Sequence, residues 1–235
     1  MPGGPGGEAG TAVLTLPGTP VRVGWSGRAD GDMGRPPGPD LLARALGLAY
    51  PPRLLRQVHG AGVVVAEDAP GAGEEPPEGD ALVTAVAGLG LAVRVADCAP
   101  VALGSAEGAC GAVHAGWRGV RAGILEGAVA AVRALGAGTV VAAVGPCARP
   151  CCYEFSPSDL DALVRTWGAA VVGRTRAGRP ALDLAAAVGA VLGAVGVPVV
   201  ADAGTCTVCS PRHYSYRGGD TTARQAMVVW REAAR

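Results

Sequence analysis

Hydrophobic and polar positions along the chain predict many short strands and a few helices. The apolar runs at 11–16 and 21–25 flank Pro17-Gly18, which predicts two strands joined by a turn. Four more β-rich runs follow one another after short turns: ALVTAV (81–86), LAVRVA (91–96), PVALG (100–104) and ACGAVHA (109–115). Because these runs are short and adjacent, they favour antiparallel or mixed pairing over βαβ crossovers.

The remaining periodic segments predict helices and a few isolated strands. Strands are expected at 63–66, 139–145, 197–200 and 226–230, and helices at 40–48, 120–135, from Ser156 onward and at 181–194. In 120–135, Ile124, Val129 and Val132 are spaced to form one apolar helix face. Asp159 follows Ser156 by three positions, which resembles a capping box with Asp in place of Glu.

The segments between these elements show neither an internal repeat nor a linker. The fold class expected is therefore α/β (α+β): a single-domain layered sandwich of mixed β-sheets flanked by helices. Residues 1–10 are expected to form a flexible N-terminal tail, and 11–235 one domain. The acidic loop at 67–79 is too poor in apolar residues to pack. The uncharged run between Asp183 and Asp202 is interpreted as a buried helix and a strand rather than a membrane span.

Charge and composition exclude several classes of protein. The 235 residues contain 20 basic and 20 acidic side chains, so no basic excess exists to bind nucleic acid or an anionic membrane. All the basic residues are arginines, and the absence of lysine excludes Schiff-base, P-loop and protein-kinase chemistry. Residues 1–10 lack the features of a signal peptide. We therefore expect a cytoplasmic protein whose seven cysteines are reduced and available for metal binding or catalysis.

Two histidines and one cysteine stand at the ends of β-rich segments. They are His59 in QVHG, Cys98 in ADCAP and His114 in VHAGWRG. Their separations exceed those of a zinc finger, so only the fold would bring them together. Two imidazoles and a thiolate suit a catalytic zinc with an open fourth position. The alternative is structural, with Cys98 as a small buried hydrophobe and the histidines as turn residues.

Copper is a further alternative for the same three residues. A blue-copper site would need an axial methionine, for which Met33 and Met227 are the internal candidates. The chain has three histidines in total, and three imidazoles cannot ligate both centres of a multicopper oxidase.

Polar residues near these motifs have both functional and structural interpretations. Arg118 could hold phosphate or form a surface ion pair, and Gln57 could contact a purine edge or satisfy the backbone. Asp97 could orient a ligand histidine or cap its strand end. Arg217, between alternating tyrosines, could stack on a ligand or belong to a sheet edge.

The other cysteines leave a second question open. Cys206 and Cys209 form one CxxC motif, and a structural zinc would need two further ligands from Cys147, Cys151 or Cys152. The alternative is that these are simple buried or mobile thiols. His213 has no partner in the metal motifs and is expected at the surface.

Five motifs in this order resemble the signature of the laccase-domain family, also called multicopper polyphenol oxidase-like or YfiH-like proteins. They are QVHG, ADC-x-P, HAGWRG, GP-x(6)-YEF and CT-x(6)-YSYR. The resemblance runs from about Val21 to Trp230, and it implies that 11–235 is one catalytic domain with the layered fold expected above. The sequence departs from the family pattern at Tyr216-Arg217-Gly218, at Thr222-Ala223-Arg224 and in the cysteine-rich segment 145–152.

The resemblance implies a zinc ion bound by His59, Cys98 and His114. It implies a purine nucleoside phosphorylase that cleaves adenosine, inosine and S-methyl-5′-thioadenosine with phosphate and also deaminates adenosine. Gln57, Arg118 and Arg217 are then candidate substrate contacts. The older laccase label implies phenol oxidation with copper, which the histidine count disfavours as the main role; copper binding in vitro stays open.

Two other classes of function remain as alternatives. Cys98 as nucleophile and His114 as base would make a cysteine hydrolase acting on an amide, such as a peptidoglycan precursor. A non-enzymatic binding module would instead use the acidic loop 67–79. Zinc content distinguishes the cysteine hydrolase from the zinc enzyme, because a thiolate that is bound to a metal is a poor nucleophile.

Overall fold

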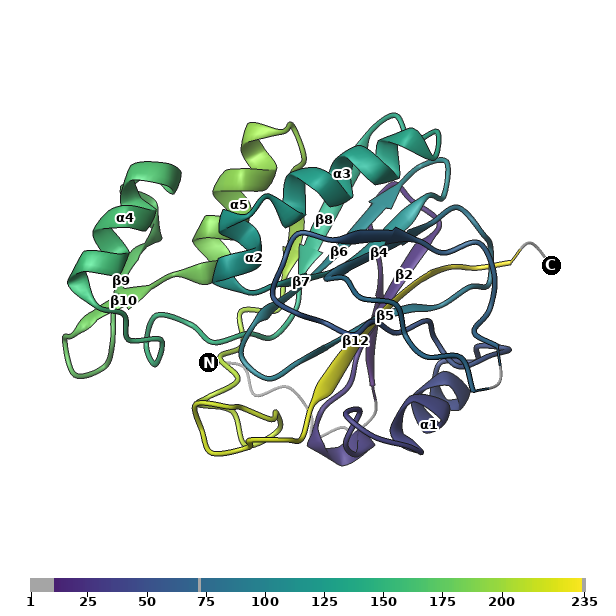
Figure 1. Ribbon diagram of the computed structural model, residues 1–235, viewed down its shortest axis with the longest axis horizontal. Coiled ribbons are helices and arrows are strands. Elements are labelled where there is room, and N and C mark those ends of the chain that lie inside the picture. The colour runs from purple at the N-terminus through teal and green to yellow at the C-terminus, as the bar shows by residue number, and fades with distance from the viewer. Residues whose placement is uncertain (1–10, 72, 234–235) are drawn as a thin grey trace, which may run out of the picture.

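Two β-sheets lie face to face in the computed structural model, which describes residues 11–71 and 73–233 (Figure 1). The smaller sheet is antiparallel, and its strands in spatial order are β1 (Ala12–Thr15), β2 (Val21–Trp25), β12 (Gln225–Arg231) and β5 (Leu91–Val95). The larger sheet has the spatial order β11 (Val199–Asp202), β8 (Val140–Val144), β6 (Ala99–Ser105), β7 (Cys110–Ala115), β4 (Ala81–Thr84) and β3 (Val63–Val65). Its two outer pairs are parallel and its inner pairs antiparallel, so it is a mixed sheet.

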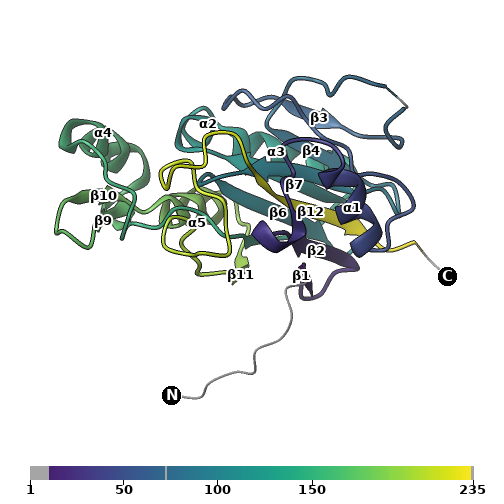
Figure 2. The ribbon, with the colours of Figure 1, turned by 90° about the horizontal axis from the view of Figure 1, so that it is seen from below.

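Helices cover the outer faces of both sheets. The larger sheet packs against α2 (Trp117–Arg121), α3 (Ile124–Ala134) and α5 (Leu184–Ala194), and the smaller sheet packs against α1 (Gly38–Ala45). A side lobe projects beyond the sandwich in both views, with α4 (Pro157–Trp167) and the hairpin of β9 (Val172–Arg174) and β10 (Pro180–Leu182) (Figures 1 and 2). Two short 3-10 helices, Arg28–Asp30 and Ala169–Val171, complete the elements of the described residues.

Strand β12 shows how the layers are stabilised. Met227 and Val229 point into the apolar cluster between the two sheets, whereas Val228 and Trp230 point to the cluster beneath α1. Alternate side chains of a strand face opposite sides of a sheet, so a strand buried on both faces requires a continuous apolar sequence. The run 226–230 is therefore buried on both faces of the smaller sheet.

The expected layered sandwich of mixed sheets and flanking helices is confirmed. The uncharged run before Asp202 forms α5 and β11, as expected. Within residues 11–71 and 73–233, no helix has the length and apolar character that a bilayer span requires. Arg53 pairs with Asp68 and Glu74 of the acidic loop, so part of that loop is tied to the sandwich. The expected N-terminal tail, 1–10, lies outside the described residues.

Some element boundaries were predicted wrongly. The helix expected at 120–135 is two helices, α2 and α3, because Gly123 between them has a φ of 93° that interrupts the helical path. The helix expected from 181 begins at Leu184, because Asp183 caps its first turn and the two preceding residues belong to β10. At α4 the expected cap is present, since Ser156 accepts the backbone N–H of Asp159 at 3.2 Å.

Candidate metal centre and cavity

The fold brings His59, Cys98 and His114 together from three separate segments. His59 lies in the loop before β3, Cys98 immediately precedes β6, and His114 lies within β7. Their possible ligand atoms all lie within 4.8 Å of one another. The two imidazole rings meet edge to face, with centroids 4.7 Å apart and planes at 77°. One ion could therefore contact all three side chains.

The buried carboxylate of Asp80 holds both histidine segments. Its oxygens accept the backbone N–H groups of His59 at 2.9 Å and Gly60 at 2.7 Å. They also contact Nδ1 of His114 at 2.7 Å. His59 has a φ of 61°, a left-handed conformation that few non-glycine residues adopt, and these hydrogen bonds stabilise it.

This contact leaves Nε2 of His114 as its free ligand atom. Nδ1 donates its proton to the Asp80 carboxylate, and such a carboxylate partner orients metal-binding histidines and raises their basicity. Burial raises the pKa of Asp80, but hydrogen bonds from His114 and from the backbone of Gly60 outweigh burial. The pKa of Asp80 is therefore below its usual value, and the carboxylate stays ionised.

Cys98 and His114 form a thiolate–imidazolium pair in the metal-free protein. Burial opposes ionisation of the Cys98 thiol, but the neighbouring imidazole of His114 outweighs it and lowers the pKa of Cys98 to about 6. Burial likewise disfavours the charged imidazole, but the Cys98 thiolate and Asp80 raise the pKa of His114 to about 9. At neutral pH Cys98 is therefore the thiolate that binds a metal, and a metal at Nε2 of His114 would displace the proton that this nitrogen carries in the imidazolium.

Gly116 lines this site from the start of α2. A Cβ atom there would lie 3.1 Å from the His59 ring and 3.2 Å from the sulfur of Cys98. These contacts are tighter than ordinary van der Waals contacts, so a side chain at position 116 would displace the histidine or the thiol. The glycine of HAGWRG therefore leaves room for the three donor atoms.

Asp97 takes neither of the two roles considered for it. Its carboxylate accepts the hydroxyl groups of Thr207 and Ser215, each at 2.7 Å, and the backbone N–H of Arg217 at 2.7 Å. Asp97 therefore anchors the segment 207–217 beside Cys98, and the histidine partner is Asp80. Asp97 also has a positive φ of 93°, which turns the chain sharply before the cysteine.

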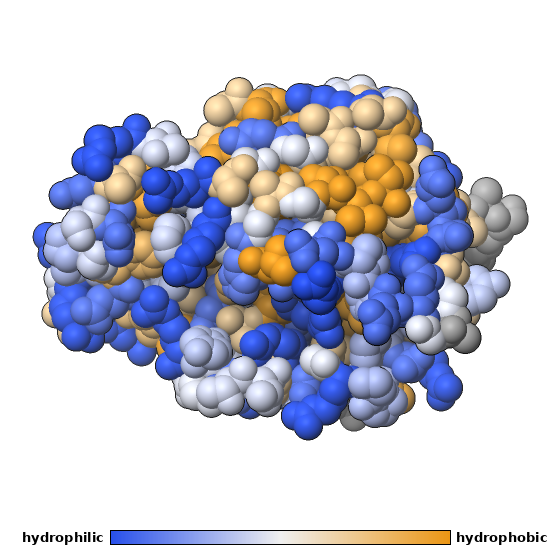
Figure 3. All heavy atoms as spheres, in the orientation of Figure 1, coloured by the Kyte–Doolittle hydropathy of each residue, from blue (hydrophilic) through white to orange (hydrophobic). Residues whose placement is uncertain are grey.

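The three donor residues line a cavity of ≈ 680 Å³. This volume lies within the range of small-molecule sites, roughly 300–1,000 Å³. Five arginines also line it: Arg56, Arg94, Arg118, Arg217 and Arg224. The face of the molecule drawn in Figure 3 mixes hydrophilic and hydrophobic areas, with a hydrophobic region toward α3. A cavity with so many guanidinium groups suits an anionic ligand.

The predicted substrate contacts Gln57, Arg118 and Arg217 all border this cavity. The Gln57 amide pairs with the backbone of Arg94 at both ends, at 2.8 and 2.9 Å. Arg118 lies over the Trp117 ring at 4.6 Å, and Arg217 over the Tyr153 ring at 4.5 Å. In the described part of the chain, neither guanidinium has a hydrogen-bonding or ion-pair partner, so both can bind a ligand.

Sequence reasoning missed Asp80 and the other cavity arginines, Arg56, Arg94 and Arg224. Arg94 was detectable as the single charge in the apolar run LAVRVA. Burial lowers the pKa of Arg94, and so does the nearby positive charge of Arg224. Asp80 gave no comparable signal, because its position before a strand is common for acidic residues. The methionines considered for copper, Met33 and Met227, lie buried in apolar clusters and do not border the cavity.

Comparison with known proteins assigns the chain to a family. Residues 39–232 match the family described as multi-copper polyphenol oxidoreductase laccase. The chain is similar to a Streptomyces coelicolor protein named purine nucleoside phosphorylase, with 43% identity over 81% of this chain and 80% of that protein. A Streptomyces griseus protein of the same name is 42% identical over 75% of this chain and 72% of its own.

A solved structure supports the fold assignment. The crystal structure of the Neisseria meningitidis protein NMB0706 superimposes with a TM-score of 0.77 at 24% identity, covering 95% of this chain and all of that one. The chain described here belongs to the laccase-like family, as the five motifs indicate. The family description implies a metal, and the donor set of two imidazoles and one thiolate fits a borderline-soft ion such as zinc.

Proposed function

We propose that this protein is a zinc-dependent purine nucleoside phosphorylase that also deaminates adenosine. The observation that carries the proposal is a single cavity bordered by both the His59–Cys98–His114 donor set and five arginines. The arginines can hold a phosphate nucleophile, and a metal at the donor set would supply a Lewis acid beside it, so one cavity offers both functions. The names of the relatives point to the same reaction.

Zinc would be held by the thiolate of Cys98 and the imidazoles of His59 and His114. Bound zinc supplies a Lewis acid with an open fourth position. Asp80 keeps His114 in the tautomer that presents Nε2 and fixes the backbone on both sides of His59. Copper can occupy the same donors in vitro, but the chain's three histidines cannot complete a multicopper centre.

Phosphate binding is assigned to the arginines. Arg118 lies in α2, just beyond the end of the ligand strand β7, and carries an exposed guanidinium that can bind an anion through two N–H groups. Arg94 and Arg224 carry like charges near each other, and an anion between them would relieve their repulsion. The purine is assigned to the side of the cavity where Arg217 and Tyr153 stack.

In phosphorolysis, a phosphate oxygen forms a bond to C1′ of the ribose while the C1′–N9 bond breaks. The purine leaves with the bonding electrons and takes up a proton, and the products are a free base and ribose-1-phosphate. Adenosine, inosine and S-methyl-5′-thioadenosine share this bond. In deamination, water adds at C6 of adenosine and ammonia leaves, which gives inosine.

The pairing of Cys98 with His114 supports a second candidate. A thiolate with a pKa of about 6 beside an imidazolium is the arrangement of a cysteine hydrolase, which would act on an amide such as a peptidoglycan precursor. Such an enzyme would work without metal, and zinc would inhibit it by occupying the nucleophile.

The test is product identification with the zinc-loaded protein. Adenosine with inorganic phosphate should give adenine and ribose-1-phosphate, and adenosine without phosphate should give some inosine and ammonia. Chromatography separates these products. If adenine release does not depend on phosphate, the proposed reaction is wrong. If the metal-free protein is the more active form on amides, the hydrolase is the correct function.

A further inference from the structure

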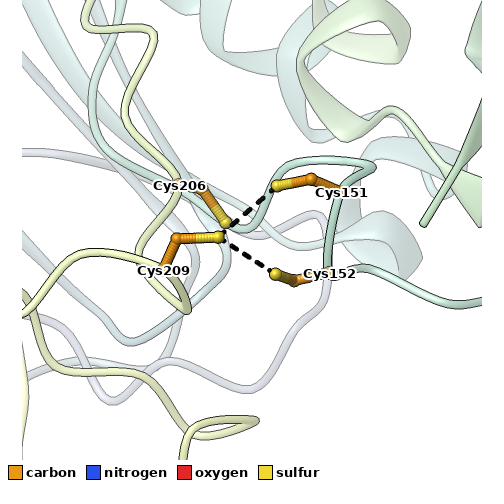
Figure 4. Close-up of side chains that lie close together, drawn as sticks. All are labelled: Cys151, Cys152, Cys206 and Cys209. Carbon is orange, nitrogen blue, oxygen red and sulfur yellow. Dashed lines mark hydrogen bonds between the residues drawn. The ribbon is translucent and has the colours of Figure 1, made fainter. Parts of the chain in front are cut away.

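Four cysteine side chains meet outside the cavity. Cys151 and Cys152 lie between β8 and α4, and Cys206 and Cys209 lie after β11. Their sulfur atoms all lie within 4.8 Å of one another, although the two pairs are far apart in the sequence. In Figure 4 the sulfurs of all four side chains point toward one another. The sulfur of Cys209 is 3.6 Å from that of Cys151 and 3.1 Å from that of Cys152.

These distances suit a shared metal ion better than disulfide bonds. A disulfide joins its sulfurs at about 2.05 Å, and all four of these cysteines are free. In a tetrahedral zinc site with Zn–S bonds of about 2.3 Å, neighbouring sulfurs lie about 3.8 Å apart. Small shifts of the side chains would therefore place four sulfurs around one ion.

The backbone around the cluster is already ordered by hydrogen bonds. Cys147 donates its N–H to the carbonyl of Thr205 at 3.2 Å, and its own carbonyl accepts the N–H of Thr207 at 3.1 Å. The N–H of Arg149 points at the sulfur of Cys206 at 3.5 Å. Backbone donors to ligand sulfurs are typical neighbours of structural metal sites. The two cysteine pairs are thus held on joined segments.

We propose that Cys151, Cys152, Cys206 and Cys209 form a structural zinc site with four thiolate ligands. Four soft sulfur donors select zinc over the hard cations magnesium and calcium. Cys147 is not a ligand, because its side chain is packed in the hydrophobic core. With four protein ligands the site is closed, so it has no position for substrate and stabilises structure.

The site would tie together two walls of the cavity. Thr207 lies within the CxxC turn and donates its hydroxyl to Asp97, the neighbour of Cys98. Tyr153 directly follows Cys152 and borders the cavity beneath Arg217. A zinc ion at the cysteine cluster would hold in place both the Thr207–Asp97 hydrogen bond and the stacking of Arg217 on Tyr153. This inference depends on the cysteine geometry and not on the reaction proposed above.

Metal analysis of the intact protein and of single variants tests the proposal. We expect about two zinc ions per wild-type chain, one in Cys98→Ala and one in Cys209→Ser. Cys209 is exposed, so its substitution opens no cavity in the core. Cys110→Ala is the matched control, because this buried thiol lies outside both groups and its loss should leave about two zinc ions bound.

X-ray absorption of zinc in Cys98→Ala provides a readout that leaves all four cysteines in place. We expect four sulfur neighbours at about 2.3 Å and no nitrogen or oxygen ligand. Zinc-free Cys98→Ala protein, iron in place of zinc, a mixed ligand shell, or disulfides among these cysteines in protein purified under reducing conditions would each overturn the proposal. An unchanged zinc content in Cys209→Ser would overturn it as well.

Discussion

Asp80 connects the two histidines of the metal centre, because its carboxylate accepts hydrogen bonds from both segments that carry them. At the scale of single residues, this one side chain determines the tautomer of His114 and the backbone conformation of His59. The three donors are far apart in the sequence, so the local backbone of one does not position another. A residue such as Asp80, which contacts two of the segments, is therefore needed to hold the set together.

Replacing Asp80 with Asn should weaken zinc binding at His59–Cys98–His114 by about 10- to 100-fold. The amide has the same shape but lacks the charge, and its NH₂ group would oppose the backbone N–H groups that now donate to the carboxylate. Competition with a chelator measures the affinity. Asp68→Asn changes an exposed carboxylate outside the cavity and should bind zinc as the wild type does. Equal affinity in both variants would contradict the role given to Asp80.

The ionisation of Cys98 gives a pH-dependent prediction. The thiol has a lowered pKa of about 6, so its thiolate is present at neutral pH and is lost only as the pH falls through about 6. Alkylation of Cys98 in metal-free protein, followed by peptide mass spectrometry, should therefore reach half its maximal rate near pH 6. His114→Ala should move that midpoint upward, because it removes the imidazolium. A wild-type midpoint near that of a free thiol, about 8.5, would refute the thiolate–imidazolium pair.

Arg118 is predicted to act on phosphate. Arg118→Ala should slow phosphorolysis by roughly 10- to 150-fold, as expected for a lost charge-assisted contact of ~1.5–3 kcal/mol. Deamination, which uses no phosphate, should change less. Arg121 lies on the same helix, is exposed and does not border the cavity, so Arg121→Ala is the control. Equal losses in both reactions would instead give Arg118 a structural or purine-positioning role.

At the scale of elements, local patterns predicted strands better than helix ends. Each of the β-rich runs became a strand, and those between 81 and 115 formed the buried strands β4 to β7, because a buried strand needs an apolar sequence that is visible in the chain. The break between α2 and α3 was missed, because the apolar spacing continues through Gly123 and the pattern does not report φ. The hairpin β9–β10 was missed because its strands are short and partly exposed.

Alanine substitutions of two glycines, one at the break between α2 and α3 and one inside α5, should have opposite effects on stability. Gly123→Ala should destabilise the protein by about 1 kcal/mol, because an L side chain at a φ of 93° is strained. Gly189 lies inside α5 with open space where a Cβ would be, so Gly189→Ala should stabilise by roughly 0.5–1 kcal/mol. Urea unfolding measures both. A stability gain in Gly123→Ala would mean that the two helices can fuse.

At the scale of the whole molecule, the cavity is assembled from segments that only the sheet topology brings together. The sequence offered His59, Cys98 and His114 as candidate ligands because they stand at the ends of β-rich segments, and the resemblance to the laccase-domain family favoured them over the structural alternative. The motifs could not identify Asp80 as the histidine partner or Arg224 as a cavity residue, because Asp80 reaches His114 through the pairing of β4 with β7 and Arg224 reaches the cavity from the segment before β12. The sequence likewise left open whether the cysteines form a zinc site or are simple thiols, because their grouping depends on contacts between segments that are far apart in the chain.

Phosphorolysis is proposed to take place at the His59–Cys98–His114 centre. The most direct test is phosphate-dependent adenine formation from adenosine in Cys98→Ala, with the zinc content and fold of the same sample measured alongside. We predict that this variant is folded, has lost one zinc ion relative to the wild type, and forms no adenine above the uncatalysed rate. Wild-type phosphorolysis in a variant that lacks this zinc would show that the reaction takes place elsewhere.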